Sequence, residues 1–567
     1  MIVGIDLGTT NSAVGVWRNG RAELIPNRLG QTLTPSAVGL DESGALLVGM
    51  AARERMSTHP GRTAVTFKRY MGSTRATPLG DRTYLPEELS GLLLSSLRAD
   101  AEAYLGEPVT EAVITVPAYF NDRQRKATRR AGELAGLKVQ RLLNEPTAAA
   151  LAYGIHELGD ESRFLVFDLG GGTFDVSILE IFEGVIEVRA SAGDNRLGGE
   201  DFNDLLVAEM FTRFGKDWGE AAKTDAGLRQ RLRASAERAR RTLTDNAAAT
   251  LSVIWKDQAW EMEITGDVFE ARAASLLARL REPVLRSLRD SDIRAEALSE
   301  IVLVGGATRM PVVRRAVTRM FGRFPSTAVH PDEAVALGAA IQAGLKARDI
   351  DLKEIVLTDV CPYSLGVEST EMGPNGQVRG SVFSPVIERN TVVPASRVQS
   401  FYPVHNGQRK VNFNIYQGES RNVADNIRLG EVEIPVPPGK ASEVEIQCRF
   451  TYDINGLIEI NLTVPATGES RELLIVDDEG PKGEDLAQQR ARLALLKQHP
   501  RENEANRAAL SRANRCYEDY LGDRRDYVAG LMSRFEAVLE TQDPVAADHA
   551  RAELTSALDA LEGESYL

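Results

Sequence analysis

A short pattern that occurs twice restricts the fold of this chain more than any other feature. Residues 4–10 read GIDLGTT, and residues 166–173 read VFDLGGGT. In each copy an apolar strand reaches an Asp, a turn of Gly and Thr follows, and a second β-rich run comes next, at 13–17 or 176–181. Two copies of strand, Asp, turn and strand predict two similar lobes that face each other.

Around this repeat the first part of the chain alternates between strands and helices. Apolar β-branched runs at 112–116, 164–167 and 301–304 are typical of strands buried on both faces. Between such runs, 122–135 and 228–243 have helical periodicity. This alternation predicts an α/β architecture. At 567 residues the chain is too long for one core, so further domains are expected.

The pattern changes near residue 354. An apolar segment at 355–357 precedes strand-like runs such as 411–416, 444–450 and 457–464, whose alternation is typical of a sheet with one buried face. After GPKG at 480–483 the pattern is helical to the end. The expected parts are an α/β domain at 1–353, an interdomain linker at 354–360, an antiparallel β-sandwich at 361–478 and a short α-helical, lid-like bundle at 479–567.

Composition excludes several classes of protein. The net charge of −14 argues against nucleic acid as a ligand, because binding phosphates requires clustered Lys and Arg. The three cysteines are far apart, which argues against a disulfide framework and a CxxC metal pair. The first residues have no basic region or cleavage site, and no apolar run is long enough to span a bilayer. We therefore expect a cytoplasmic protein that binds no membrane.

The repeated turns have the chemistry of a phosphate site. A Gly/Thr turn after a strand directs backbone N–H groups and hydroxyls to one point, and an Asp beside it can hold Mg²⁺ through water. The phosphate loop GxxxxGK[ST] is absent, as is GxGxxG after a strand. One copy alone is equally well explained as an ordinary hairpin turn. Two copies with matching Asp favour a clamp on the β- and γ-phosphates.

With further motifs, the chain resembles the actin-like ATPase superfamily, and specifically the DnaK-type heat-shock chaperone family of the seventy-kilodalton class. Its length and short tail look most similar to the HscC branch. The likeness extends to about residue 478. Besides the two turns it rests on ITVPAYF (114–120), NEPTAAA (144–150), LGGEDF (197–202), GGATRMP (305–311), PYSLGVE (362–368) and YQGE (416–419).

The resemblance implies an ATPase that binds ATP and ADP with Mg²⁺ and K⁺. The residues implied in catalysis are Lys68, Glu145, Asp168, Thr173 and Asp175, with Asp6 and Asp168 arranging the metal. Without the resemblance, Lys68 would be interpreted as an exposed helical lysine. Nucleotide contacts are implied for Gly8, Thr9, Thr10, Asn11, Gly170, Gly171, Gly172, Thr173, Gly198, Gly199, Glu200, Glu237, Arg240, Arg241, Thr244, Gly305, Gly306, Arg309 and Asp332. The family more often has Lys and Ser at 240 and 244, and both changes keep the donors.

The resemblance further implies a chaperone that binds extended hydrophobic peptide segments, with ATP binding and hydrolysis switching its affinity. The positions that match the peptide site are Leu365, Val367, Phe401, Val404, Val411, Phe413 and Leu457, all of which could instead be core residues of a sandwich. Val404 and Phe413 are bulkier than is usual there, which predicts a narrower pocket.

The same resemblance bears on two kinds of protein partner. Arg141, Asn144, Thr147 and Asp359 match the surface that receives a J-domain co-chaperone, although an Arg and an Asp are often merely solvated. Segments 73–85 and 246–266 are shorter than in typical members, so a standard nucleotide-exchange factor is not expected.

Three other functions fit parts of the sequence. A metabolite kinase or a filament-forming protein of the same superfamily would leave the β-sandwich unexplained. A dedicated regulator that binds one folded partner has the same motifs as a general chaperone, and the two hypotheses remain open at this point.

Overall fold

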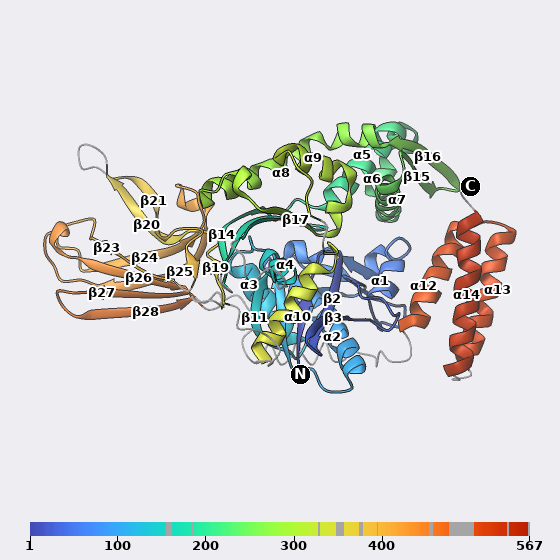
Figure 1. Cartoon of the computed structure of the whole chain (residues 1–567), viewed down its shortest axis with the longest axis horizontal. Coiled ribbons are helices and arrows are strands. Elements are labelled where there is room, and N and C mark those ends of the chain that lie inside the picture. Colours follow the sequence, from blue (N-terminus) through green and yellow to red (C-terminus); the bar gives the residue numbers. More distant parts are fainter. Residues whose placement is uncertain are drawn as a thin grey trace.

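The computed structural model describes residues 1–154, 162–182, 185–326, 329–347, 356–372, 378–393, 395–452, 458–475, 504–540 and 544–564. Figure 1 shows the α/β part in the middle, with a β-sandwich at one end and a helical bundle at the other. Among the described residues, no helix has the length and apolarity needed to cross a bilayer.

The first lobe is built on a sheet with the strand order β11-β10-β1-β2-β3. Strand β10 runs parallel to both β1 and β11, whereas β2 is antiparallel to β1 and β3. The strands are β1 (Ile2–Asp6), β2 (Asn11–Arg18), β3 (Arg21–Ile25), β4 (Thr34–Pro35), β10 (Glu111–Val116) and β11 (Lys138–Asn144). Helices α2 (Pro86–Leu105) and α3 (Asp122–Leu134) complete its main core.

Small elements extend this lobe on the side of the bundle (Figure 1). They are α1 (Met50–Glu54) and the strands β5 (Ala37–Leu40), β6 (Leu46–Val48), β7 (Thr63–Val65), β8 (Thr77–Leu79) and β9 (Arg82–Tyr84).

The second lobe repeats this arrangement, with the strand order β17-β12-β13-β14-β18. The outer strand β17 is parallel to its neighbour β12, and β12, β13 and β14 form an antiparallel meander. The strands are β12 (Ser162–Leu169), β13 (Phe174–Phe182), β14 (Val185–Asp194), β17 (Glu300–Val304) and β18 (Val356–Leu357). The two similar lobes predicted from the repeated turn are therefore present.

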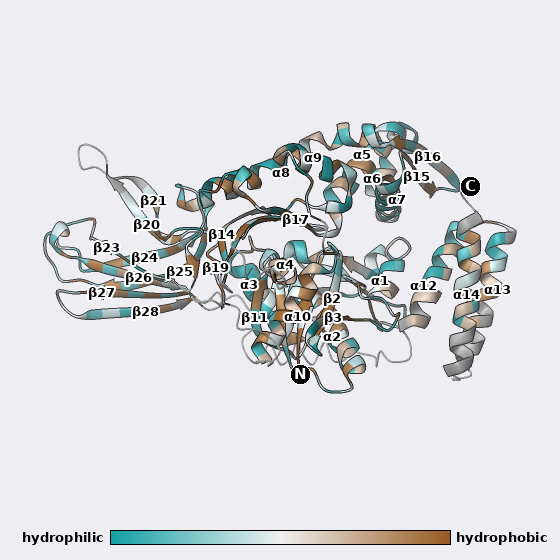
Figure 2. Ribbon diagram, viewed as in Figure 1, coloured by the Kyte–Doolittle hydropathy of each residue, from teal (hydrophilic) through white to brown (hydrophobic). Residues whose placement is uncertain are grey.

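Helices and a hairpin surround the second sheet. They are α5 (Gly199–Trp218), α6 (Glu220–Thr224), α7 (Ala226–Asp245), α8 (Gly266–Ser291), α9 (Pro311–Phe321) and the hairpin β15 (Ala248–Trp255) and β16 (Gln258–Thr265). Figure 2 shows the central strands as mostly hydrophobic, whereas the outer helix α8 carries hydrophilic residues along its length. This contrast fits strands that are buried on both faces.

Two helices connect the lobes at their centre. Helix α4 (Glu145–Gly154) follows a strand of the first lobe and packs against the core of the second, and α10 (Ala334–Ala347) packs against both β1 and α4. A Cβ on Gly338 would overlap the backbone of Ala148, so only glycine allows α4 and α10 to approach this closely.

The β-sandwich consists of two antiparallel sheets, ordered β21-β20-β24-β25 and β23-β26-β27-β28. Its strands are β20 (Leu365–Met372), β21 (Val378–Ile387), β23 (Ala395–Phe401), β24 (Lys410–Gln417), β25 (Ile427–Pro435), β26 (Ile446–Tyr452), β27 (Ile458–Val464) and β28 (Glu469–Ile475), with the two-residue strands β19 (Asp359–Val360) and β22 (Val392–Val393) beside it. Along β27 every second residue is buried, as the sequence alternation predicts. The strand expected at 444–450 begins later, at Ile446, because residues 441–443 form a 3₁₀ turn.

The C-terminal bundle consists of α12 (Glu504–Asp519), α13 (Asp523–Glu540) and α14 (Pro544–Glu564). Cys516, Phe535 and Leu558 are among the buried residues of its own small core. The bundle lies against α1 of the first lobe, at the end of the molecule opposite the β-sandwich (Figure 1). The fold expected from sequence is confirmed: an actin-like two-lobed α/β unit, an antiparallel sandwich and a short helical tail.

Candidate functional site

The two Gly/Thr turns meet face to face between the lobes. A Cβ added to Gly171 would overlap the hydroxyl of Thr10, and one added to Gly172 would crowd the methyl group of Thr9. The first turn is fixed by Gly8, whose N–H donates to Ser12 Oγ at 3.0 Å and whose carbonyl accepts from Ser36 at 2.7 Å. Two glycine-rich backbones that approach from opposite sides form a cradle for phosphate oxygens.

The start of α5 holds the second turn in place. The N–H groups of Gly199 and Glu200 donate to the carbonyls of Gly170 and Gly171, both at 2.9 Å. Gly198 packs directly on the backbone of the turn, where a Cβ would not fit. The motif LGGEDF therefore positions the phosphate cradle, and Gly198 and Gly172 stand behind the cavity rather than among its lining residues.

Buried carboxylates gather around one lysine below the turns. Lys68 is 2% exposed, and its Nζ lies 2.6 Å from Glu145 Oε1. The interpretation of Lys68 as an exposed helical lysine is therefore wrong. Asp6 lies at the end of β1 and accepts a hydrogen bond from Thr115 at 2.9 Å, and Asp175 accepts from the Tyr119 N–H at 3.2 Å.

These carboxylates carry more negative charge than the protein itself neutralises. Burial, reinforced by the charge of Glu145, raises the pKa of Asp6 to about 7 and that of Asp175 to about 8. The same two causes raise the pKa of Asp168 well above its ordinary value. Asp168 Oδ2 is buried and accepts no hydrogen bond from the described residues. Such a cluster fits a divalent cation, which would supply the missing positive charge.

The carboxylate positions do not form a direct ligand cage. In the described part of the chain, no group of three or more His, Cys, Asp or Glu residues is arranged to ligate a metal ion. Mg²⁺ dehydrates reluctantly and is commonly held by one or two carboxylates together with water and phosphate oxygens. Asp6 and Asp168 could therefore hold Mg²⁺ together with water and phosphate oxygens, and their role in metal binding stays a prediction.

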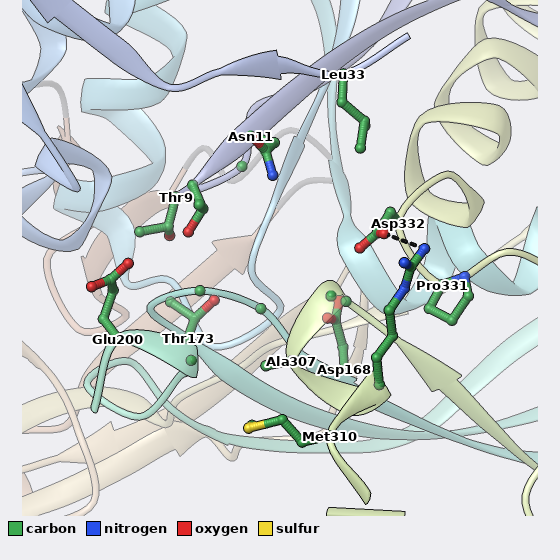
Figure 3. Close-up of a pocket in the computed structure, with 18 of the residues that line it drawn as sticks. Thr9, Asn11, Leu33, Asp168, Thr173, Glu200, Ala307, Met310, Pro331 and Asp332 are labelled. Atoms are coloured by element: carbon green, nitrogen blue, oxygen red, sulfur yellow. Dashed lines mark ion pairs between the residues drawn. The ribbon is translucent and has the colours of Figure 1, made fainter. Parts of the chain in front are cut away.

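A cavity of about 520 Å³ opens from the phosphate cradle into the space between the lobes. Figure 3 shows Thr9, Thr173 and Glu200 on one side of this space and Asp332 and Pro331 on the other. The volume is within the range of small-molecule sites. The predicted residues that line it are Asp6, Gly8, Thr9, Thr10, Asn11, Lys68, Glu145, Asp168, Gly170, Gly171, Thr173, Gly199, Glu200, Glu237, Arg240, Arg241, Thr244, Gly305, Gly306, Arg309 and Asp332.

Several of these charged side chains already have partners. Arg309 pairs with Asp332 at 2.6 Å, and Arg240 Nε donates to Asn203 at 2.8 Å. Glu237 accepts from Arg53 of α1 at 2.9 Å, and this ion pair connects the two lobes beside the cavity, which Glu237 lines and Arg53 does not. Sequence reasoning missed Arg53, because nothing in its local pattern indicates which residue of the other lobe it will face.

Sequence reasoning also missed several residues that line the cavity itself. They are Leu33, Asp245, Ala307, Met310, His330, Pro331 and Val335. Ala307 and Met310 belong to the motif GGATRMP, which was recognised in the sequence, but these two residues were not predicted to line the cavity. Asp175, in contrast, was expected at the site and lies behind the lining, where it holds the backbone of Tyr119.

The residues expected at a J-domain surface lie together but are mostly covered. Asn144 donates to Asp359 at 2.6 Å, and Arg141 donates to Gln342 at 3.1 Å. Arg141, Asn144 and Thr147 are buried, and burial raises the pKa of Asp359. The alternative interpretation of a solvated Arg and Asp is therefore wrong.

The β-sandwich contacts both lobes beside this cluster. Gln417 of the motif YQGE accepts from the Asp122 N–H at 3.1 Å, and Arg389 binds Asp290 of α8 at 2.8 Å. Strand β18 joins the sandwich to the second lobe by pairing in parallel with β14. Residues 356–357, which precede the sandwich in sequence, thus form an edge strand of the second lobe.

The residues expected to bind peptide are divided between the core and the edge of the sandwich. Leu365, Val367 and Phe413 are buried in its core, Phe401 and Val411 pack against that core, and Val404 is half-buried. Leu457 lies outside the described residues. The rings of Phe401 and Phe413 meet edge to face at a centroid distance of 5.6 Å.

Together, the facing turns, the buried lysine and the cavity between two similar lobes define a nucleotide-hydrolysing enzyme of the actin-like class, here joined to a β-sandwich. The protein-family model described as Hsp70 protein matches residues 2–81 and 75–565. This chain belongs to the Hsp70 family, and it is accordingly an ATP hydrolase and an ATP-dependent chaperone.

Curated relatives support the same family. The chain is 42% identical over 496 residues to the chaperone protein DnaK of Thermotoga neapolitana, which covers 86% of this chain and 82% of that protein. It is 43% identical over 485 residues to the chaperone protein DnaK of Thermotoga maritima and to that of Thermotoga petrophila, with 84% of this chain and 80% of each relative covered.

Proposed function

We propose that ATP hydrolysis in the cavity between the lobes controls how tightly the β-sandwich holds an extended peptide. The observation that carries this proposal is the convergence of both phosphate turns on Lys68 and the buried carboxylates, in a chain whose linker strand β18 belongs to the same sheet as Asp168. In-line phosphoryl transfer requires positioning and charge stabilisation, and this set of residues provides both.

Each group has a distinct role in the proposed reaction. Asp6 and Asp168 would hold Mg²⁺, which when bound would neutralise phosphate charge. Glu145, together with Asp175 from behind the cavity lining, would help to place the metal and the attacking water, and Lys68 stabilises the transferring phosphoryl group. The backbone of the two turns and the hydroxyls of Thr9, Thr10 and Thr173 bind phosphate oxygens. A K⁺ ion beside the same phosphates is proposed on the resemblance alone.

The nucleoside part of ATP is proposed to lie between α7 and the loop that contains Gly305. Glu237, Arg240, Arg241 and Thr244 line the cavity on one side. Gly305, Gly306, Arg309 and Asp332 line it on the other.

The domain organisation is part of the proposal. We assign 1–353 to the ATPase domain, 354–360 to the linker, 361–478 to the peptide-binding domain and 479–567 to the helical bundle. Placement in the HscC branch of the family is also part of the proposal. The cytoplasm is the proposed location.

Two partners are proposed. Unfolded or extended peptide is expected to bind the sandwich through main-chain hydrogen bonds and one apolar pocket. A J-domain co-chaperone is expected to act near Arg141, Asn144, Thr147 and Asp359. Because these residues are largely covered where β19 meets the first lobe, its binding is expected to depend on how the sandwich is docked.

The Lys68→Ala variant tests the proposed chemistry. Losing one electrostatic stabiliser of the transition state is expected to lower kcat by roughly 100–1000-fold. ATP binding should persist, because the turns and α7 are unchanged. Single-turnover hydrolysis and ATP titration measure the two effects separately, and Lys216→Ala, at an exposed lysine of α5 outside the cavity, is a matched control. Hydrolysis within a fewfold of wild type would remove Lys68 from the mechanism.

A dedicated regulator of one folded partner is the second candidate function. The tight packing of Phe413 against Phe401 favours it, since a filled pocket would accept few peptides. A pull-down from lysate with the Lys68→Ala variant distinguishes the two functions. A general chaperone should retain many unrelated clients, and recovery of a single folded protein would support the dedicated regulator.

A further inference from the structure

Helix α1 connects the nucleotide cavity to the C-terminal bundle. Its last two residues have different partners. Arg53 binds Glu237 of α7, a residue that lines the nucleotide cavity, with Nη2 at 3.0 and 2.9 Å from the two carboxylate oxygens. Glu54, the next residue, accepts from Arg515 Nε of α12 at 3.0 Å. One short helix therefore carries a contact to the second lobe and a contact to the bundle side by side.

The bundle rests on α1 through apolar as well as charged contacts. Ala508 of α12 is buried in a small cluster with Ala51, Ala52 and Leu47 of the first lobe. Small alanine side chains on both helices allow close approach and good packing. Arg515 also donates to Glu562 of α14 at 2.8 Å, so the ion pair with Glu54 is anchored in the bundle rather than made by an isolated side chain.

The bundle also faces the second lobe. Asp519, in the last turn of α12, is buried enough for its pKa to be raised, while the charges of Arg515 and of Arg231 and Arg238 on α7 oppose this rise. The bundle thus lies near both helices that the pair between Arg53 and Glu237 joins. Figure 1 shows it beside α1 and below the β15–β16 hairpin of the second lobe.

We propose that the C-terminal bundle is a built-in clamp on the nucleotide cavity. When docked, the bundle fixes α1 so that Arg53 stays paired with Glu237, which keeps the lobes together and slows the release of ADP. Undocking of the bundle frees α1 and speeds release. The inference rests on the proposed nucleotide site, because Glu237 is one of its residues.

The docked bundle also covers a surface that an external exchange factor would otherwise be able to contact. The surface of α1 that Ala508 and Arg515 cover is unavailable to another protein while the bundle is docked. The chain's own tail therefore occupies a position from which the distance between the lobes can be controlled.

Release of a fluorescent ADP analogue from the full-length protein, followed by stopped flow, tests the clamp. Arg515→Glu and Glu54→Arg should each speed release by about threefold to fivefold, the factor that one partly exposed ion pair supplies. The double variant Glu54→Arg with Arg515→Glu restores an opposite-charge pair and should return the rate to within about twofold of wild type. Arg272→Glu, which breaks an ion pair with Glu209 on the second lobe away from the bundle, is the matched control and should leave the rate unchanged.

Two results would overturn the clamp: unchanged release in both single variants, or faster release that the double variant does not reverse. Far-UV circular dichroism separates the second result from simple loss of the helices. Failure of the wild-type protein to bind the ADP analogue would instead contradict the proposed nucleotide site, so the two proposals fail in different ways.

Discussion

At the scale of single residues, we expect Phe413 to limit which peptides the β-sandwich can hold. Its side chain is 3% exposed and meets Phe401 edge to face, within the group of residues expected to contact peptide. An aromatic ring in this position fills volume that a peptide side chain would otherwise occupy. We therefore expect a preference for peptides with small side chains at the central position.

Replacing Phe413 by Val should enlarge the pocket. Burying one additional Leu side chain is worth about 1.5–3 kcal/mol, so a Leu-centred peptide should bind roughly 10–100-fold tighter to the variant. The cavity also lowers the stability of the sandwich by about 1–4 kcal/mol. Fluorescence anisotropy with Leu- and Ala-centred peptides measures the preference, with Phe383→Val on β21 as a control. Equal affinities for both peptides in the variant would exclude Phe413 as the determinant.

Residues whose role depends on local pattern could be predicted from the sequence, and those whose role depends on tertiary approach could not. Asp6 and the two glycine-rich turns were recognised because strand, Asp and turn recur together. Read without the resemblance, Lys68 was interpreted as exposed, because its burial depends on Glu145 arriving from another segment. Arg53 was missed for the same reason, since its partner Glu237 is far away in sequence.

At the scale of elements, we propose that the linker strand β18 couples ATP hydrolysis to peptide binding. Strand β18 pairs with β14, placing Val356 opposite Val185 and Leu357 opposite Ile186. Leu357 packs against the core shared by α4 and α10. The position of the strand therefore depends directly on the second lobe. An apolar sequence is needed there because packing holds the strand in place.

Leu357→Asp should detach this strand. A charge cannot be buried in an apolar core without a partner, so docking of β18 becomes unfavourable. Basal ATP hydrolysis and peptide binding should both persist, while stimulation of hydrolysis by peptide is lost. Steady-state ATPase assays with increasing peptide measure this, and Val398→Asp on an exposed position of β23 is the control. Undiminished stimulation in Leu357→Asp would mean that another contact carries the signal.

The sequence predicted the type of most elements better than their contacts. Alternation along β27 and helical periodicity over α3 and α7 gave elements of the expected type within a few residues. The sequence did not reveal that YQGE binds the N-terminus of α3 through Gln417. That contact depends on how the sandwich docks, and no local periodicity encodes docking.

At the scale of the whole molecule, the lobes stand between two attachments. The β-sandwich contacts them through Tyr363, whose ring lies 4.4 Å from that of Tyr119, and through Arg389, which binds Asp290 of α8. The C-terminal bundle contacts them at the other end through α1 (Figure 1). We infer that a change in the separation of the lobes alters their contacts with both the sandwich and the bundle. Nucleotide binding, peptide binding and docking of the bundle are then thermodynamically coupled.

The most direct test of control by the ATPase lobes is to measure how ATP changes the affinity for peptide and how peptide changes the affinity for ATP. In the slowly hydrolysing Lys68→Ala variant, the affinity for a fluorescent peptide is titrated with and without saturating ATP, and the affinity for ATP is titrated with and without saturating peptide. If the lobes and the sandwich are coupled, ATP should weaken peptide binding by roughly 5–150-fold, and peptide should weaken ATP binding by the same factor. Peptide affinity that does not change when ATP binds would contradict the proposal that the ATPase lobes control the sandwich.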